Sequence, residues 1–294
     1  MSPANLHLAG IGLMLLGCFV SAGNSALSKT MLLVYPVTQV LLFRSVSALT
    51  LASPFVSVAA IQAAPRRRLQ IFRFVINGVE AAIFFVSITY LPLIDVMTYY
   101  LAGPIYVTAL SVVFLGEKVG WRRWTAVSVG FIGVLIALRP SEAALSWPAL
   151  LALSGSLLYA VVLMTTRMLR GTSDTVLLVS QFSSLLLVTA VAAPFQWLAP
   201  SWRDAALMAL IGAFTLTSAF CTNRSLKLAP ASVVVPYQYT LLLWGGVFGY
   251  VVFGERPAAT TLIGAAIIIA AGVYIFLREA KLKARAEEPL PPPP

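Results

Sequence analysis

Charged residues are scarce in this sequence, since Asp, Glu, Lys and Arg make up only 10% of its 294 residues. A soluble globular chain has about 25%. Hydrophobic residues account for 60% of the chain, and the mean hydropathy is +0.91. A soluble protein of this length cannot bury so much apolar surface, so the composition indicates an integral membrane protein in a lipid bilayer. We therefore interpret the net charge of +10 as a mark of membrane orientation and expect no nucleic-acid partner.

Histidine and cysteine are also nearly missing. The single histidine, His7, excludes a histidine proton relay, a zinc site built on histidines and a Ser-His-Asp constellation. Cys18 and Cys221 both fall within apolar stretches and give no disulfide framework. No GxxxxGK[ST] phrase is present, which excludes a P-loop ATP site. We expect no enzyme and no cofactor, but transport by facilitated diffusion or by proton coupling through a carboxylate.

Long apolar stretches are abundant. Each is roughly 18–25 residues long, which is enough to cross a ~30 Å hydrocarbon core as a helix. The ~10-residue alternating segments of a membrane β-barrel are absent. We therefore predict an all-α integral membrane protein with ten transmembrane helices. Their approximate ranges are 6–27, 34–59, 70–90, 93–115, 121–138, 147–168, 173–197, 203–228, 231–253 and 258–277.

The basic residues predict the orientation of the chain in the membrane. With ten spans, 15 of the 20 Lys and Arg residues fall on the side of the two termini, including Arg73 in the loop before the third span. The opposite side has four, and Arg44 lies inside a span. Because positive residues concentrate in cytoplasmic loops, we predict a multi-pass protein of the bacterial inner membrane with both termini in the cytoplasm. The charged and proline-rich tail, 278–294, is predicted to be disordered.

One phrase occurs twice, as FLGEKVGW at 114–121 and as VFGERPAA at 252–259. The offset of 138 residues also aligns further special residues: Ser87 with Ser225, Pro92 with Pro230, Tyr99 with Tyr237 and Gly17 with Gly155. It corresponds to five spans, an odd number, so the second copy crosses the membrane in the opposite direction. We predict two inverted five-helix repeats, 1–138 and 139–277, an arrangement found in many secondary transporters.

The repeated phrase itself suggests a helix boundary. Gly116 and Gly254 would end one helix, and Glu117 and Glu255 would start the next, where the helix dipole favours negative charge. We interpret both glutamates as turn and cap residues. A role in gating is the alternative.

The stretch 91–138 resembles the EamA-type repeat of the drug/metabolite transporter superfamily. The resemblance rests on the following residues: Pro92, Pro104, Gly116, Glu117, Gly130 and Gly133 in the first copy, and Pro230, Gly254, Glu255, Gly264 and Gly272 in the second. Leu242 departs from the pattern, because Pro104 stands at that place in the first copy. The resemblance implies a ten-helix secondary transporter and is specific for fold rather than for substrate.

The sequence is also similar to the bacterial aromatic amino-acid exporter branch. This similarity implies export of amino acids, aromatic ones included, or of related small metabolites, by alternating access. Efflux of drugs or lipophilic cations by the same superfamily is the alternative. A channel or flippase would need a continuous polar stripe, and an intramembrane enzyme would need more paired groups at depth than the chain offers.

Charged residues within spans are the first candidates for the substrate site, because a charge in the bilayer is costly and faces protein or water. Glu80 in span 70–90 would hold a substrate ammonium or a proton, and Arg44 would hold a carboxylate. A structural ion pair between helices is the alternative. Asn77 lies one turn before Glu80 and would either line the site or bond a neighbouring helix.

Aromatic and polar residues within spans are the second group of candidates. They are Tyr99, Tyr100, Tyr159, Tyr237 and Gln238. Aromatic walls with a few polar groups suit a partly apolar solute, whereas interfacial belts are the competing interpretation.

Helix breakers inside spans form the third group of candidates. We predict bending points at Gly103, Pro104 and Pro236, since proline removes a helical hydrogen bond. A complete pair of repeats would enclose a path within one chain. We therefore predict a monomer, with a dimer as the alternative.

Overall fold

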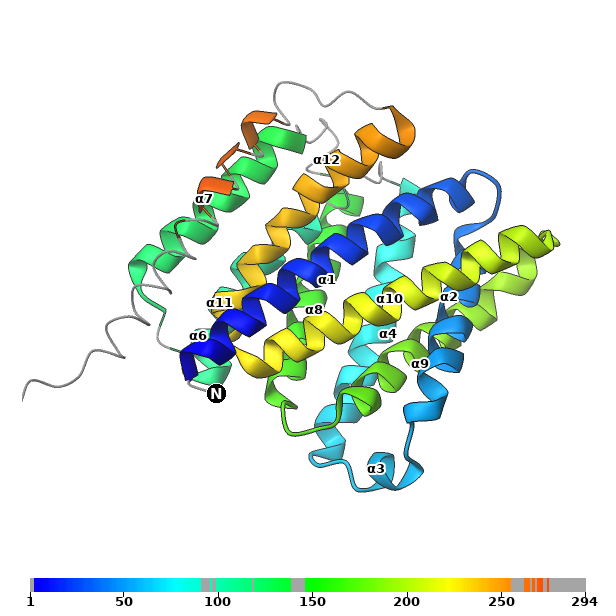
Figure 1. Ribbon diagram of the computed structural model, residues 1–294, viewed down its shortest axis with the longest axis horizontal. Coiled ribbons are helices and arrows are strands. Elements are labelled where there is room, and N and C mark those ends of the chain that lie inside the picture. Colours follow the sequence, from blue (N-terminus) through cyan, green and yellow to red (C-terminus); the bar gives the residue numbers. More distant parts are fainter. Residues whose placement is uncertain are drawn as a thin grey trace, which may run out of the picture.

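The computed structural model describes residues 3–90, 96, 99–117, 119–138 and 146–254, and short helical stretches between 262 and 274. All regular elements in these ranges are helices (Figure 1). In the first half they are α1 (Pro3–Leu32), α2 (Val37–Ala52), η1 (Ser53–Phe55), α3 (Val58–Gln62), α4 (Arg67–Tyr90), α6 (Gly103–Leu115) and α7 (Trp121–Leu138). In the second half they are α8 (Trp147–Met168), α9 (Asp174–Ala192), η3 (Ala193–Gln196), α10 (Trp202–Leu228), α11 (Ala231–Val234), η4 (Val235–Tyr239) and α12 (Thr240–Phe253).

Two groups of packed helices make up most of the molecule. In the first, which we call the α1 group, α1 packs along α10 and α12, and the short elements α11 and η4 lead into α12 (Figure 1). In the second, the α8 group, α8 packs against α4 and α6. Helices α2 and α9 pack on each other; α2 also packs against α10 of the α1 group, and α9 packs against α4 of the α8 group and against α10. Each group therefore combines helices from both halves of the sequence.

Five helical stretches of the described chain are long and apolar enough to cross a membrane. They are Asn5–Leu32, Trp147–Met168, Asp174–Val191, Trp202–Leu228 and Ala231–Phe253. The fold is thus an all-α membrane fold, as the sequence predicts. The predicted span 258–277 lies mostly outside the described residues, as do Glu255 and the tail 278–294. The count of ten helices and the inverted repeat therefore stay predictions.

The predicted span 34–59 is wrong at its end. Helix α2 stops at Ala52, and Pro54 stands in the first turn of the 3₁₀ segment η1. Proline supplies no backbone N–H for the helix, so the chain turns there and starts again as α3. The predicted span 173–197 is interrupted in the same way, since α9 ends at Ala192 and η3 carries Pro194. Apolar content alone did not reveal these breaks.

The glycines of the repeated phrase end their helices, as predicted. Gly116 follows α6 with φ of 63°, and Gly254 follows α12 with φ of 66°. These left-handed values suit glycine because it has no Cβ. A side chain at either position would strain the backbone, so both helix ends depend on glycine.

Glu117 is a helix cap, but not of the helix that the sequence suggests. Its Oε1 accepts a hydrogen bond from the Ala231 N–H at 3.1 Å, and its Oε2 accepts one from the Ser232 N–H at 3.2 Å. The Ser232 hydroxyl donates to Oε2 at 2.5 Å. The expected place was the start of the next helix, α7, whereas Glu117 caps α11, more than a hundred residues further along the chain. A loop of the α8 group therefore holds the α1 group.

Arg73 lies inside the protein and not in a loop. It belongs to α4 and is 1% exposed. Its Nε donates to Thr166 Oγ1 at 2.9 Å, one terminal nitrogen donates to the Leu177 carbonyl at 3.1 Å, and the other donates to Gln181 Oε1 at 3.3 Å. Three uncharged partners on α8 and α9 thus hold this cation, and Arg73 does not belong among the loop bases that predict orientation.

Small residues let α1 and α10 approach closely. The Ser225 hydroxyl donates to the Gly10 carbonyl at 2.6 Å, and the Ser218 hydroxyl donates to the Gly17 carbonyl at 2.9 Å. A Cβ at Gly10 would lie 2.9 Å from the Ala229 Cβ. Close backbone approach with cross-helix hydrogen bonds is a common way to join membrane helices. It makes α1 and α10 a stable pair within the α1 group.

Candidate functional site

Glu80 lies near the middle of α4, and its side chain is half-buried. The Arg44 side chain, from α2, is near enough to interact electrostatically with its carboxylate. Arg44 is also half-buried, and its Nε has no hydrogen-bond partner among the described residues. The two predicted in-span charges, both in the described part of the chain, thus lie within electrostatic range of each other but form no ion pair within 4.0 Å, and the Arg44 Nε keeps unused hydrogen-bonding capacity.

Tyr100 extends this pair. Its hydroxyl lies close enough to interact with the Glu80 carboxylate but makes no hydrogen bond within 3.5 Å in the described part of the chain. The Phe84 ring, one turn beyond Glu80, meets the Tyr100 ring edge-on with centroids 5.2 Å apart. A carboxylate, a phenol and one further aromatic ring therefore converge between α4 and the segment that precedes α6.

A hydrogen bond connects this cluster with the α1 group. The rings of Tyr100 and Tyr159 lie 6.1 Å apart, and the Gln238 Nε2 donates to the Tyr159 hydroxyl at 3.0 Å. Tyr159 comes from α8 and Gln238 from η4. Tyr100 and Gln238 occupy equivalent positions under the 138-residue offset. Tyr159 therefore contacts one residue from each half of the sequence, Tyr100 and Gln238. The candidate site, defined here as Arg44, Glu80, Tyr100, Tyr159 and Gln238, lies between the two helix groups.

Two neighbours of this site were not found from the sequence. Gly155, on α8, leaves room for Tyr100, because a Cβ there would lie 2.5 Å from the Tyr100 hydroxyl and 2.8 Å from Ile83 Cγ2. Phe84 is the second. For Gly155 the only signal in the sequence was its alignment with Gly17 under the 138-residue offset. That alignment predicts the repeat but does not indicate a residue of the site. A phenylalanine in an apolar stretch gives no signal.

Asn77 bonds a neighbouring helix. It is 6% exposed, and its Nδ2 donates to the Gln181 carbonyl of α9 at 3.2 Å. This contact corresponds to the second of its two predicted roles, a bond to a neighbouring helix. A part for Asn77 in lining the site stays a prediction.

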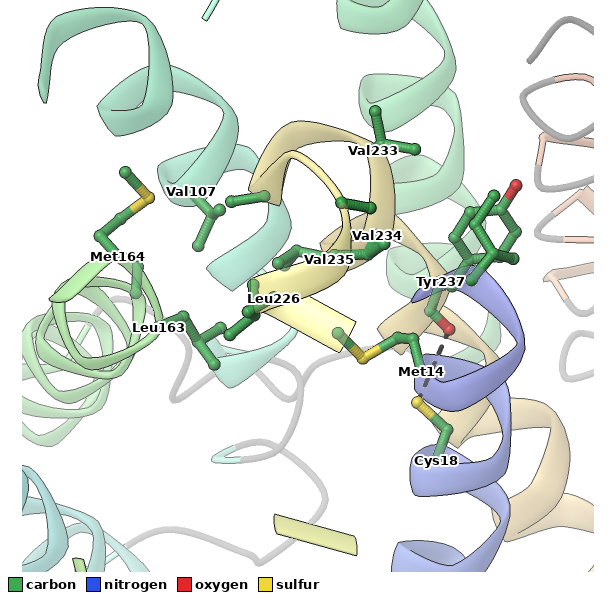
Figure 2. Close-up of a cluster of buried hydrophobic side chains, with 14 of the residues drawn as sticks. Met14, Cys18, Val107, Leu163, Met164, Leu226, Val233, Val234, Val235 and Tyr237 are labelled. Carbon is green, nitrogen blue, oxygen red and sulfur yellow. Dashed lines mark hydrogen bonds between the residues drawn. The ribbon is translucent and has the colours of Figure 1, made fainter. Parts of the chain in front are cut away.

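Tyr99 and Tyr237 pack in apolar surroundings. Tyr99 contacts the buried cluster around Val96 and Ala152. Tyr237 belongs to the large buried cluster of Figure 2, where its backbone carbonyl accepts a hydrogen bond from the Cys18 thiol at 3.8 Å. The clusters that hold the two repeat mates also contact Tyr100 and Tyr159 of the candidate site, and a role of Tyr99 and Tyr237 in substrate binding stays a prediction.

The predicted bending points fall at changes of helix type. Gly103 starts α6, with Pro104 in its first turn, and a Cβ at Gly103 would lie 3.6 Å from the Tyr159 ring. Pro236 stands in the first turn of the 3₁₀ segment η4, between α11 and α12. Both breaks therefore adjoin residues of the candidate site, and their role as hinges stays a prediction.

The sequence matches the EamA-like transporter family twice, over residues 8–139 and 146–278. The chain belongs to the EamA-like transporter family. Together with the apolar helices, this membership identifies a multi-pass membrane transporter of small molecules and not an enzyme.

Several named EamA-like relatives are similar over much of the chain. An S-adenosylmethionine uptake transporter of Rickettsia felis is 26% identical, over 96% of this chain and 97% of the relative. A riboflavin transporter of Vibrio cholerae is 30% identical, over 64% and 63%. The pseudopaline exporter CntI of Pseudomonas aeruginosa is 24% identical, over 92% and 97%. These relatives differ in substrate and direction, so the family does not define either for this chain.

A solved crystal structure of another protein superposes with a TM-score of 0.74 at 14% sequence identity. The match covers 96% of this chain and 98% of that one. At this identity the likeness concerns the fold alone.

Proposed function

We propose that this EamA-like protein is a secondary transporter that exports amino acids, aromatic ones included, or related small metabolites across the bacterial inner membrane. The observation that carries this proposal is the placement of Glu80 and Arg44 together inside the helix bundle, beside Tyr100, Tyr159 and Gln238. In-membrane charges that face the protein interior usually serve the transported solute or ion.

The chemistry of the candidate site suits an amino-acid group. A carboxylate complements the α-ammonium, and a guanidinium complements the α-carboxylate through paired hydrogen bonds. The aromatic faces of Phe84, Tyr100 and Tyr159 suit an apolar or aromatic side chain and also a cation. S-adenosylmethionine, which a relative takes up, itself carries an α-ammonium and an α-carboxylate.

We also propose that 1–138 and 139–277 are two inverted repeats whose helices combine into the α1 and α8 groups, and that these two groups rock around this site. The two family matches, at 8–139 and 146–278, support this division. The site lies between the α1 and α8 groups, so relative motion of the two would expose it to each side in turn. One chain contains both groups, which supports a monomer as the working unit.

Transport in proteoliposomes tests the proposal. Radiolabelled tryptophan, phenylalanine, S-adenosylmethionine and riboflavin are supplied with and without an imposed pH gradient. We expect movement of the amino acids by the parent protein and a loss of about tenfold or more in Glu80→Gln, since the amide cannot pair with an ammonium. The control is Asp204→Asn, an equal change at a carboxylate that bonds Tyr35 and Ser201 outside the site.

The pH gradient separates two mechanisms. Accumulation that needs the gradient and disappears in Glu80→Gln would make Glu80 the coupling residue. If folded protein moves riboflavin or a lipophilic cation but no amino acid, the amino-acid assignment is wrong while transport stands.

A further inference from the structure

A buried apolar cluster joins the two helix groups at the end of the molecule where the chain starts. We call it the plug. Its members are Ile11, Met14 and Cys18 of α1, Val107 of α6, Ala160, Leu163 and Met164 of α8, Leu226 of α10, and Val233, Val234, Val235 and Tyr237. Figure 2 shows Leu163, Met164 and Val107 on one side, and Met14 and Cys18 on the other, with the 233–235 segment between them. Most of these side chains are less than 5% exposed, so the plug is a densely packed apolar contact between the two groups, and Tyr159 of the candidate site packs against it.

Two charged side chains cross between the groups at the same end. Glu117, after α6, bonds the first two residues of α11 through three hydrogen bonds. Arg167, at the end of α8, donates to the carbonyls of Leu226 and Lys227 at 2.7 Å and 2.9 Å. Glu117 and Arg167 also attract each other electrostatically. These contacts run from the α8 group to the α1 group, so the groups cannot separate at this face while they persist.

Burial decreases along the three successive elements that start at the helix capped by Glu117, namely α11, η4 and α12. Every residue of α11 and η4, from Ala231 to Tyr239, is buried, whereas α12, from Thr240 to Phe253, has no buried residue. Gln238 of the candidate site lies at the transition, and Tyr159 packs against the plug. The groups are thus most tightly joined on the face of the N-terminus, which Figure 1 places near α6 and α11.

We infer that Glu117 is a latch that holds this transporter closed on the N-terminal face, and that its bonds to α11 break when the site opens to that side. Because the carboxylate sits at the start of a helix, it satisfies N–H groups that otherwise lack partners. The latch is a positioning residue, since it acts through α11 and η4 and does not contact the candidate site.

The latch inference rests on the proposed alternating motion but not on the identity of the substrate. A native reporter exists, because Cys18 lies in the plug at 3% exposure. In a Cys221→Ala background, a membrane-impermeant maleimide reaches Cys18 only when the plug opens. The reagent is applied to the N-terminal face of sealed proteoliposomes, so no substrate is needed.

We expect Glu117→Ala to raise the rate of Cys18 labelling about tenfold or more, because hydrogen bonds to a charged group contribute roughly 1.5–3 kcal/mol each. Glu117→Gln, which keeps an acceptor, should lie between Glu117→Ala and the parent. The matched control is Asp174→Asn, which removes a carboxylate that bonds Lys227 and Arg224 at the same face, not the α8 group. It should label at the parent rate.

Unchanged labelling in a Glu117→Ala protein with the parent's thermal midpoint would overturn the latch, and equal acceleration in Asp174→Asn would do the same. If Glu117→Ala does not fold, Ser232→Ala removes only one of the three bonds, and we expect about tenfold faster labelling, because that bond is also one to a charged group. Parent-rate labelling there would also overturn the inference. Failure of amino-acid transport alone, with labelling as expected, would affect the substrate proposal and not the latch.

Discussion

Gly155 shows how one missing side chain shapes the candidate site. The Tyr100 hydroxyl and Ile83 occupy the space that a Cβ at this position would need, at 2.5 Å and 2.8 Å. Contacts this short force a neighbour to move, and Tyr100 is the neighbour that approaches Glu80. The position of the phenol relative to the carboxylate thus depends on a glycine in another helix.

Gly155→Ala should therefore slow transport about tenfold or more, since small displacements of a positioned group have large effects on rate. The initial rate of solute movement in proteoliposomes measures this effect. Gly12→Ala is the control, because a Cβ there meets nothing within 4 Å, and it should keep the parent rate. Equal rates in both variants would show that Tyr100 tolerates the displacement.

The hydrogen bond between Gln238 and Tyr159 is testable by a double-mutant cycle. The bond measures 3.0 Å and joins the two helix groups. We expect Gln238→Ala and Tyr159→Phe to be non-additive, with a coupling energy of about 0.5–1.5 kcal/mol in the free energy of unfolding in detergent. Strict additivity would mean that the bond does not persist in solution.

Polar residues within spans predicted most of this site, because a charge or an amide inside a long apolar stretch is costly and usually faces a site or a protein partner. Glu80, Arg44, Tyr100, Tyr159 and Gln238 all carry that signal. Their convergence was not predictable, since it depends on how α2, α4, α8 and η4 pack. The choice between the two predicted roles of Asn77 was open for the same reason, because the sequence does not say which neighbouring helix lies against each face of α4.

At the scale of the element, η4 is the most informative segment. It interrupts the helix from Ala231 to Phe253 with a 3₁₀ turn that carries Pro236, and Tyr239 at its end donates to the Val127 carbonyl of α7 at 3.3 Å. A 3₁₀ stretch within a helix often marks a hinge. Here it lies between the latched α11 and the less buried α12.

Pro236→Ala restores a backbone N–H and permits a continuous α-helix through this segment. We expect transport to slow about fivefold while substrate affinity changes less than about twofold, as for a residue that acts on motion and not on binding. Initial rates and equilibrium binding to the same preparation separate the two quantities. Pro194→Ala, in the η3 segment after α9, serves as the control, and an equal loss of rate in both variants would contradict the hinge.

Sequence patterns predicted most helices well but missed several ends. The range 121–138 and the range 147–168 coincide with α7 and α8, because loops with charge or proline mark both ends clearly. The errors at Pro54 and Pro194 arose where apolar residues continue beyond a proline. In such segments the missing backbone N–H of proline ends the helix although the residues stay apolar. A prediction from hydropathy alone therefore makes the helix too long.

At the scale of the whole molecule, charge asymmetry predicts that the N-terminal face lies in the cytoplasm. Arg66, Arg67 and Arg68, which contribute to this asymmetry, are exposed at the start of α4. An epitope at the N-terminus should resist protease added to intact spheroplasts and become sensitive after permeabilisation. An epitope inserted at 199–200, in the connection before α10, should be cleaved without permeabilisation, and the reverse pattern would invert the orientation.

A few special residues of the sequence predict a two-fold repetition, but they do not predict the grouping of the helices. Each helix group takes members from both halves, because α1 packs on α10 and α12 while α8 packs on α4 and α6. Interleaving of this kind follows from side-chain packing over distances that a local pattern does not encode.

The partners of Arg73 also set an order of events during synthesis. Thr166, Leu177 and Gln181, which satisfy its guanidinium, are translated 93 to 108 residues after it. At about 5–20 residues per second, α4 waits roughly 5–20 s with an unpaired cation. We therefore expect α4 to remain beside the insertion machinery, or at the bilayer surface, until α8 and α9 arrive. The first half of this protein would then complete its membrane integration only with help from the second.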